Sequence, residues 1–325
     1  MPSNNIFNLG FWEKLPKPFF ALAPMADVTD LAFRQMFVRY GKPDVMFTEF
    51  VSTDGLCSAG RDNLLKDLRY FENERPIVAQ IWGTKPENFT RAVKILKKLK
   101  FDGVDINMGC PKPKEIKNGA CAALIRNPKL ALKIIAETKR AAGTMPVSIK
   151  TRIGFKEIQT ESWIGKLLKT QPAAITIHCR TAAEMSKVPA RWEEIARAVK
   201  IRNKLNSRTL IVGNGDIATL EEGKKRAAET GADGVMVGRG AFGNPWFFDR
   251  NASLGEIGMS EKLNAMLEHA HLFEKLFKGK KNFAVMKKHF KAYAAGFPGA
   301  RELRVKLMAT ENVEDVERAV NNLKI

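Results

Sequence analysis

The sequence predicts an α/β fold, a (β/α)8 TIM barrel followed by a C-terminal all-α helical domain. Eight apolar segments of strand length recur over about 240 residues, and amphipathic or loop segments separate them. Near-continuous apolar strands that alternate with helices require a parallel sheet covered by helices, and a barrel contains eight such units. A doubly wound sheet is the competing fold, but Ala-Pro-Met-Ala stands at 23–26, where its glycine-rich turn would follow the first strand.

The predicted strands are apolar runs that end in polar or turn-forming residues. They cover Phe19–Met25, Val45–Phe50, Ile77–Gly83, Gly103–Gly109, Val147–Gly154, Ala173–Arg180, Thr209–Asp216 and Gly234–Gly240. Between them, apolar residues at helical spacing predict helices over Pro86–Lys100, Pro128–Ala142, Trp192–Leu205 and Leu220–Thr230. We therefore expect residues 1–250 to form the barrel domain.

From residue 251 the strand signal stops and only helical spacing remains. The pattern predicts helices over Leu263–Phe277, Phe283–Tyr293, Glu302–Met308 and Val313–Leu323. Residues 251–325 are therefore expected to form a small helical domain. A chain of 325 residues that is 45% hydrophobic is long enough for one large domain and one small one.

The charge of the chain is strongly positive and concentrated near the C-terminus. Lys and Arg outnumber Asp and Glu by 54 to 35, which gives a net charge of +19. Between Glu274 and Thr310 there are ten Lys and Arg residues and two Glu residues. Such a cluster is typical of a protein that binds a polyanion such as nucleic acid, although a solvated helix face has the same composition.

The cysteines and the ends of the chain indicate the compartment. The four cysteines, Cys57, Cys110, Cys121 and Cys179, show no paired or metal-like spacing, which fits a reducing compartment and predicts no bound metal. The N-terminus has no secretory leader pattern, and no apolar run approaches membrane-spanning length. We expect a soluble, cytoplasmic monomer that does not contact a membrane.

Residues 104–111, Val-Asp-Ile-Asn-Met-Gly-Cys-Pro, are the most informative stretch of the chain. The apolar run ends at Asn107, Gly109 allows a turn, and Pro111 forbids a helix through it. Cys110 therefore follows the C-terminal end of a strand, where barrels carry their chemistry. A cysteine that only packs would be expected inside an element, so we interpret Cys110 as a reactive thiol.

The other predicted strand ends carry polar side chains that converge at the same mouth of a barrel. They are Pro24 and Met25, Gln80, Asn107, Lys150 and Arg152, His178 and Arg180, Asn214 to Asp216, and Gly238 with Arg239. The glycine-rich turns at 213–215 and 238–240 follow strands seven and eight, where barrels bind phosphate. The amides of Gln80 and Asn107 and the cation of Lys150 suit a planar heterocycle. A phosphate site beside a ring site describes flavin mononucleotide (FMN).

These motifs, taken as an ordered set, resemble the tRNA-dihydrouridine synthase family. The matching segments are Ala-Pro-Met-Ala at 23–26, Gln80, Asn-Met-Gly-Cys-Pro at 107–111, Lys-Thr-Arg at 150–152, His-Cys-Arg-Thr at 178–181, Gly-Asn-Gly-Asp at 213–216 and Gly-Arg-Gly at 238–240. Near the C-terminus, His289-Phe290, Gly-Phe-Pro-Gly-Ala at 296–300 and Leu303-Arg304 resemble the helical domain of its bacterial B-type branch.

The resemblance implies an FMN enzyme that uses NADPH to reduce the C5–C6 double bond of specific uridines in tRNA to 5,6-dihydrouridine. It implies that Cys110 is the proton donor. The implied FMN ligands are Pro24, Met25, Gln80, Lys150, His178, Asn214, Gly215, Asp216, Gly238 and Arg239, and the implied uridine contacts are Asn107, Lys150, Arg152 and Arg180. Two positions depart from the family pattern, because Cys121 and Cys179 stand where glycine is usual.

The residue types favour this chemistry independently of the resemblance. Hydride addition at C6 of a pyrimidine builds negative charge toward C5 and O4, and a thiol with a pKa of about 8.5 is mostly protonated at neutral pH and can supply the proton. A stacked uridine would have to be extruded to reach the mouth. We expect the barrel to bind FMN without the helical domain, and the helical domain to bind tRNA phosphates.

Two alternatives stay open at this stage. A dihydroorotate dehydrogenase-like FMN oxidoreductase would handle the same pyrimidine bond, but it would not need the basic helical extension. A non-catalytic RNA-binding barrel would be expected to have lost Cys110 or the glycine turns, and both are intact.

Overall fold

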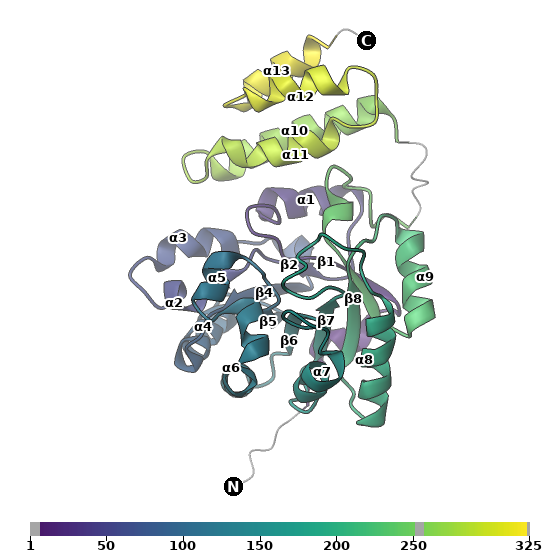
Figure 1. Cartoon of the computed structure of the whole chain (residues 1–325). Coiled ribbons are helices and arrows are strands. Elements are labelled where there is room, and N and C mark those ends of the chain that lie inside the picture. Colours follow the sequence, from purple (N-terminus) through teal and green to yellow (C-terminus); the bar gives the residue numbers. More distant parts are fainter. Residues whose placement is uncertain (1–6, 251–256, 324–325) are drawn as a thin grey trace.

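The strands form one parallel barrel, and four helices of the C-terminal part lie in a layer beside it (Figure 1). The computed structural model describes residues 7–250 and 257–323. The barrel strands are β1 Phe19–Leu22, β2 Met46–Phe47, β4 Ile77–Trp82, β5 Gly103–Met108, β6 Val147–Arg152, β7 Ala174–His178, β8 Leu210–Asn214 and β9 Gly234–Val237. Neighbours pair in the order β1-β9-β8-β7-β6-β5-β4-β2, and all of these pairs are parallel.

The barrel closes between β1 and β2. A parallel bridge joins Ala21 to Val45, and the backbone N–H of Leu22 donates to the Val45 carbonyl at 3.1 Å. A further short strand, β3 Val51–Ser52, pairs with the end of β4. The predicted fold class, an eight-stranded barrel with C-terminal helices, is confirmed.

Side chains of the strands alternate between two hydrophobic clusters, as a period of two residues requires. Phe19 and Ala21 belong to the cluster that also holds Phe47, Val212 and residues of other strands. Phe20 and Leu22 point the other way and pack with the helices. Both faces of the strands are therefore buried, which explains why the strands read as continuous apolar runs.

The four helices predicted around the barrel are present, two of them with the predicted bounds and two shorter by two residues, and the structure adds five more. Together they are α1 Leu31–Tyr40, α2 Thr53–Leu56, α3 Arg61–Leu65, α4 Pro86–Lys98, α5 Pro113–Lys117, α6 Pro128–Ala142, α7 Thr160–Leu168, α8 Glu193–Lys204 and α9 Leu220–Thr230. The predicted strands extended too far, because the polar residues at their ends turn into loops over the rim. Of the predicted strand Val45–Phe50, only Met46–Phe47 forms a strand, β2, and Val45 adds a single bridge to Ala21.

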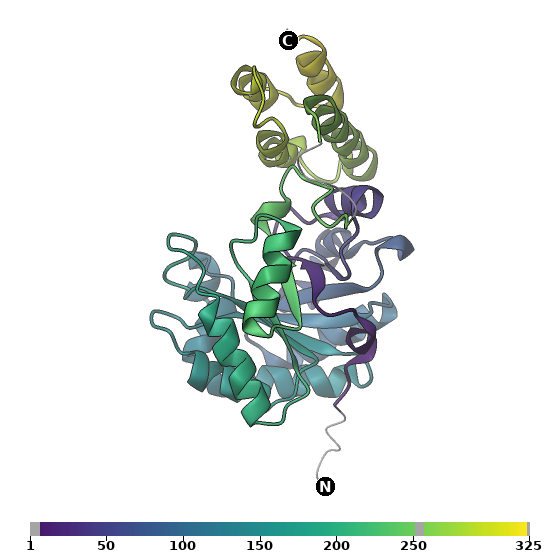
Figure 2. The same cartoon turned by 90° about the vertical axis from the view of Figure 1, so that its right-hand side faces the viewer.

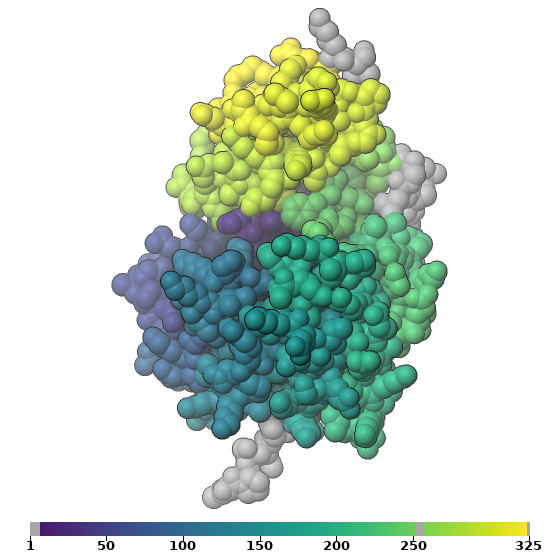
Figure 3. All heavy atoms as spheres, in the orientation of Figure 1, coloured from purple at the N-terminus to yellow at the C-terminus, as the bar shows by residue number. Residues whose placement is uncertain are grey.

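The helical layer consists of α10 Met259–Phe277, α11 Lys287–Tyr293, α12 Ala300–Met308 and α13 Val313–Asn321. It packs on the barrel through α1, whose Leu31, Ala32 and Met36 share one hydrophobic cluster with α10–α13. Figure 2 shows α1 beneath this layer, and in Figure 3 purple atoms of the N-terminal part lie between the two. Among the described residues, no helix is long and apolar enough to cross a membrane.

Candidate active site

Two adjoining cavities lie at the C-terminal ends of the strands. The larger, of about 530 Å³, is lined by the ends of β1, β8 and β9 and the loops that follow them. The smaller, of about 290 Å³, contains Cys110 and Asn107. Both are bordered by the same five residues, Pro24, Met25, Lys150, Arg152 and His178. The structure therefore brings most of the predicted site residues to one place, divided into two connected parts.

Cys110 is held in its loop by the side chain of Asn107. The Asn107 carboxamide oxygen accepts from the backbone N–H groups of Gly109 at 3.1 Å and Cys110 at 3.0 Å. The Asn107 amide nitrogen donates to Gln80 Oε1 at 2.9 Å. Asn107 is therefore occupied in shaping the turn that presents the thiol, in addition to lining the cavity.

The Cys110 thiol lies against the thiol of Cys121, which follows α5. A hydrogen bond from Cys121 lowers the pKa of Cys110 to about 7, although burial acts in the opposite direction. Cys121 is fully buried and has a φ of +53°, a left-handed conformation that favours glycine. The backbone N–H of Ala122 donates to the Cys110 carbonyl at 3.2 Å, which fixes the two segments together.

Gln80 belongs to a buried network that sequence reasoning did not identify. Gln80 Nε2 donates to Asp105 Oδ2 at 2.7 Å, and Ser148 Oγ donates to Asp105 Oδ1 at 2.6 Å. Burial raises the pKa of Asp105 to about 6. Together with its bond from Asn107, Gln80 is thus oriented through both ends of its amide. The clue in the sequence was a carboxylate within an apolar strand.

Lys150 places a cation between the two cavities. Its Nζ donates to the Asn214 carboxamide oxygen at 3.0 Å, and Asn214 Nδ2 donates to the Met236 carbonyl at 2.8 Å. Burial, aided by the nearby Arg152, lowers the pKa of Lys150 to about 8. The lysine is held by a neutral partner, so its charge remains available to an anionic group.

Arg152 holds two loops of the rim together. Its Nε donates to the Gly109 carbonyl at 2.8 Å, and its NH1 donates to the carbonyls of Thr181 and Met185, each at 2.9 Å. Burial lowers the pKa of Arg152 to about 10. The guanidinium thus supports the loop of Cys110 and also borders both cavities.

His178 and Arg180 occupy different environments at the end of β7. His178 borders both cavities, and its Nδ1 is buried without a hydrogen-bond partner. Burial, together with the nearby cations, lowers the pKa of His178 well below its ordinary value. The Arg180 side chain is 2% exposed, pairs with Asp216 and lies 3.3 Å from His178 Nε2. Arg180 lines neither cavity, and its contact with the uridine stays a prediction.

The two glycine-rich turns both line the larger cavity. Gly215 has a φ of +129°, and a Cβ there would stand 2.9 Å from the Ala190 Cβ. Arg239, whose side chain is 65% exposed, donates to Asp216 at 3.1 Å. The pKa of Asp216 is lowered by its hydrogen bond from Arg180, so it is an anion between two arginines. The turns thus combine open backbone with an excess of positive charge.

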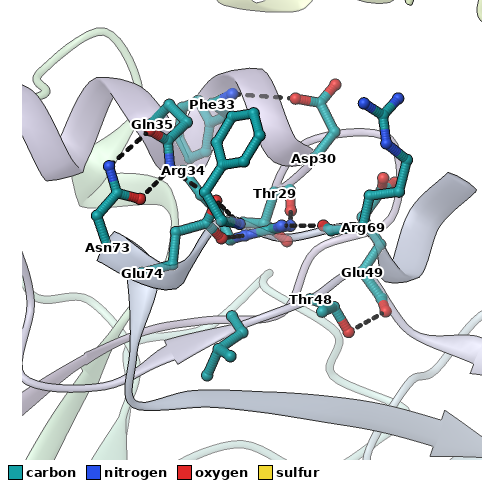
Figure 4. A network of polar contacts seen from close by, with 12 residues as sticks. Thr29, Asp30, Phe33, Arg34, Gln35, Thr48, Glu49, Arg69, Asn73 and Glu74 are labelled. Carbon is teal, nitrogen blue, oxygen red and sulfur yellow. Dashed lines mark hydrogen bonds and ion pairs between the residues drawn. The ribbon is translucent and has the colours of Figure 1, made fainter. Parts of the chain in front are cut away.

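The loop after β1 forms the edge shared by both cavities and is fixed by buried bonds. The backbone N–H of Met25 donates to Thr29 Oγ1 at 2.9 Å. Arg34, fully buried, donates to the carbonyls of Thr29 at 2.7 Å and Arg69 at 2.6 Å, and its Nε pairs with Glu74 at 2.6 Å. Figure 4 shows this network from close by.

The basic residues of the helical layer do not all face solvent. Lys281 is in ion pairs with Glu49 and Asp67, and its side chain is 9% exposed. Lys287 is half-buried, whereas Lys288 and Lys291 are exposed. Within the described ranges, 7–250 and 257–323, no three His, Cys, Asp or Glu side chains are grouped so that they could hold a metal ion.

Comparisons with known proteins agree on one family. A family model described as dihydrouridine synthase (Dus) matches residues 21–325. The chain is 41% identical to the probable tRNA-dihydrouridine synthase 2 of Bacillus subtilis over 317 residues, which are 97% of this chain and 96% of that protein. It is 40% identical to the probable tRNA-dihydrouridine synthase of Staphylococcus aureus strain COL, over 97% of this chain and 95% of that protein.

Solved structures show the same fold at low identity. Morphinone reductase in complex with tetrahydroNAD is similar with a TM-score of 0.52 and 13% identity, over 78% of this chain and 92% of that one. A variant of NCR from Zymomonas mobilis is similar with a TM-score of 0.50 and 15% identity, over 75% of this chain and 90% of that one. At such identities the likeness concerns the barrel alone.

Proposed function

The chain belongs to the dihydrouridine synthase family, and on that premise we propose that its barrel mouth binds FMN, accepts electrons from NADPH and reduces tRNA uridines with Cys110 as the proton donor. Membership of the family makes it a tRNA-dihydrouridine synthase, which is a flavin oxidoreductase acting on tRNA. The choice of FMN and NADPH and the roles of individual residues are our proposal. The observation that carries it is one thiol beside a cationic cavity of cofactor size.

The larger cavity fits FMN in size, charge and open polar atoms. Its volume of about 530 Å³ lies within the range of small-molecule sites, about 300–1,000 Å³. The buried His178 Nδ1 lacks a partner in the protein, so a ligand atom can satisfy it. The lining contains Lys150, Arg152 and Arg239 against Asp216, which favours an anion.

We assign the phosphate of FMN to the end of the cavity formed by Asn214–Asp216 and Gly238–Arg239. Glycine backbone permits close approach of N–H groups to an anion, and Arg239 adds a charge-assisted contact. The ring would lie toward Met25, Lys150 and His178, which border both cavities. When bound and reduced, the flavin supplies the hydride for C6 of uridine.

Cys110 then supplies the proton to C5 of the uridine from the smaller cavity. A general acid works best when its pKa lies near the working pH, and the pKa of about 7 meets that condition. Lys150 and Arg152 border this cavity and would stabilise the negative charge that develops on O4. The cavity is too small for a base within a helix, so the uridine must be extruded from its stack.

The tRNA would be bound by the basic helical layer, with a smaller set of residues than the sequence indicated. Lys281 is buried in ion pairs and is therefore removed from the RNA-binding residues. Exposed basic residues such as Lys278, Lys291 and Arg301 remain available for phosphates. Membership of the family decides against the dihydroorotate dehydrogenase and the non-catalytic alternatives.

The test is reconstitution followed by analysis of the RNA product. Purified protein incubated with FMN should turn yellow and retain about one FMN per chain. With NADPH and tRNA lacking dihydrouridine, mass spectrometry of digested tRNA should show uridines that have gained two hydrogens. Protein that takes up no FMN, or that takes it up and leaves the tRNA unchanged, would overturn the proposal.

A further inference from the structure

We infer that the helical layer is part of the cofactor site, because Lys281 and Lys288 hold the loop after β1 in the position that shapes the flavin cavity. The inference rests on the proposed binding of FMN. It differs from the sequence-based expectation that the barrel binds FMN on its own and that these lysines serve only the RNA. Both lysines would be positioning residues, since neither lines either cavity.

Lys281 makes a buried connection from the helical layer to the barrel. It lies between α10 and α11, and its Nζ is 2.7 Å from Glu49 Oε2 and 2.9 Å from Asp67 Oδ1. The Lys281 side chain is 9% exposed and the Glu49 side chain is 6% exposed. The charge of a lysine shielded from water in this way is balanced by the carboxylates that it pairs with, unlike that of a solvated surface lysine.

Glu49 links Lys281 to the loop after β1. The other oxygen of Glu49, Oε1, accepts from the backbone N–H of Asp27 at 2.5 Å. Lys288, on α11, donates from its Nζ to the Asp27 carbonyl at 2.8 Å. Asp27 has a φ of +55°, a left-handed conformation that is uncommon outside glycine, although aspartate adopts it more readily than most residues. The N–H and the carbonyl of Asp27 are thus both held by side chains that depend on the helical layer.

The held residue follows Ala26, which lines the smaller cavity, and is two positions from Met25, which lines both. The backbone N–H groups of Val28 and Thr29 donate to the Met25 carbonyl at 3.1 and 3.0 Å, so residues 25–29 form one hydrogen-bonded turn. Met25 borders both cavities, and its Sδ would lie 3.5 Å from a Cβ placed on Gly238. A shift of Asp27 would therefore move Met25 against the turn that we assign to the phosphate.

The charges make Lys281 necessary for this arrangement. Three carboxylates, the buried Asp30 and Glu49 and the half-buried Asp67, act on this one ammonium group. Burial raises the pKa of Glu49 to about 7 even with Lys281 present. Without the cation, these acids would repel one another or take up protons, and Glu49 would lose the partner that orients it. The loop after β1 would then lose the bonds that hold Asp27 in its left-handed conformation.

The experiment compares FMN binding by full-length variants, measured by quenching of flavin fluorescence, together with the visible circular dichroism of the bound flavin. Lys281→Met removes the ammonium and keeps the chain length, and Lys288→Met removes only the bond to Asp27. We expect the Kd for FMN to rise about tenfold in the first and about threefold in the second, with an altered dichroism spectrum. Lys281→Arg should restore most of the affinity, because it keeps the charge.

The control is Lys262→Met, in the first turn of α10, which should bind FMN as the parent does. Thermal unfolding of each protein without FMN identifies variants that fold. If folded Lys281→Met and Lys288→Met bind FMN with the parental Kd and spectrum, the inference is wrong. If Lys281→Met does not fold, the exposed Lys288→Met decides alone. Failure of the unaltered chain to bind FMN would overturn the proposed function, and this inference with it.

Discussion

Replacement of Cys121 by glycine should change the acidity of Cys110 without disturbing the fold. The hydrogen bond from Cys121 is the largest influence that lowers the pKa of Cys110 to about 7. With Cys121→Gly, that pKa should return toward the ordinary thiol value of about 8.5. Glycine accepts the φ of +53° at this position more easily than cysteine does, which offsets part of the lost burial.

The expected size of the effect follows from the titration of one thiol. A thiol with a pKa of about 7 is half ionised at neutral pH. At a pKa of about 8.5 it is about 3% ionised, so the thiolate fraction falls about fifteenfold. Because Cys110 must be protonated to act as the acid, tRNA reduction by the parent should decline above about pH 7. The decline in Cys121→Gly should begin more than one pH unit higher.

The assay is alkylation of Cys110 by iodoacetamide across a pH series, read by mass spectrometry of the Cys110 peptide. The midpoint of this profile reports the pKa without a correction for the nucleophilicity of the thiolate. Cys179 serves as an internal control, since burial raises its pKa to about 12 and it should stay unmodified. Cys57→Ala is the matched control variant. A Cys121→Gly protein with the parental midpoint would refute the role given to Cys121.

Arg239, α11 and the buried histidines each carry a further prediction. Arg239→Ala should weaken FMN binding about tenfold and leave riboflavin binding unchanged in titration calorimetry, because only FMN carries the phosphate; equal losses for both flavins would count against the phosphate assignment. Replacing Lys287 and Lys291 together should flatten the dependence of log affinity for tRNA on log salt by roughly one to two units, and an unchanged slope in filter binding would remove α11 from the RNA contact. Burial lowers the pKa of His269 to about 3, so the folded protein holds this histidine neutral. The folded state therefore loses stability as pH falls below about 6.5, the pKa of histidine in the unfolded chain. In urea unfolding, the free energy of unfolding of His269→Phe should fall by about 1.4 kcal/mol less than that of the parent between about pH 8 and pH 5.5. The parent is the reference because Glu49 and Asp105, whose pKa values are raised, contribute stability that increases as pH falls.

The barrel was predictable because its strands are buried on both faces and therefore appear as apolar runs. Helix α1 was not identified, since the fully buried Arg34 and its neighbour Gln35 interrupt the apolar spacing. The burial of Arg34 depends on Glu74, which lies forty residues further along the chain. Such a pair has no local signature, so sequence spacing alone cannot indicate which side of the helix is covered.

Part of the candidate site was predictable because the C-terminal ends of barrel strands converge at one mouth. This rule correctly placed Lys150, Arg152 and His178 together. The rule does not say what a side chain does there. Arg180 pairs with Asp216 and lines neither cavity, and Lys281 was counted with the RNA-binding residues although it is buried at the barrel. Both outcomes depend on carboxylates brought close by the fold, which composition does not reveal.

The role of Cys110 as proton donor is tested most directly by separate measurement of the two half-reactions in Cys110→Ala. In stopped-flow absorbance, reduction of bound FMN by NADPH should proceed at the parental rate, because no proton is delivered to uridine in that step. Reoxidation by tRNA, with dihydrouridine measured by mass spectrometry, should slow by on the order of 10²–10⁴-fold, as expected for loss of one positioned acid. Reoxidation by tRNA at the parental rate, with the parental yield of dihydrouridine, would contradict the account.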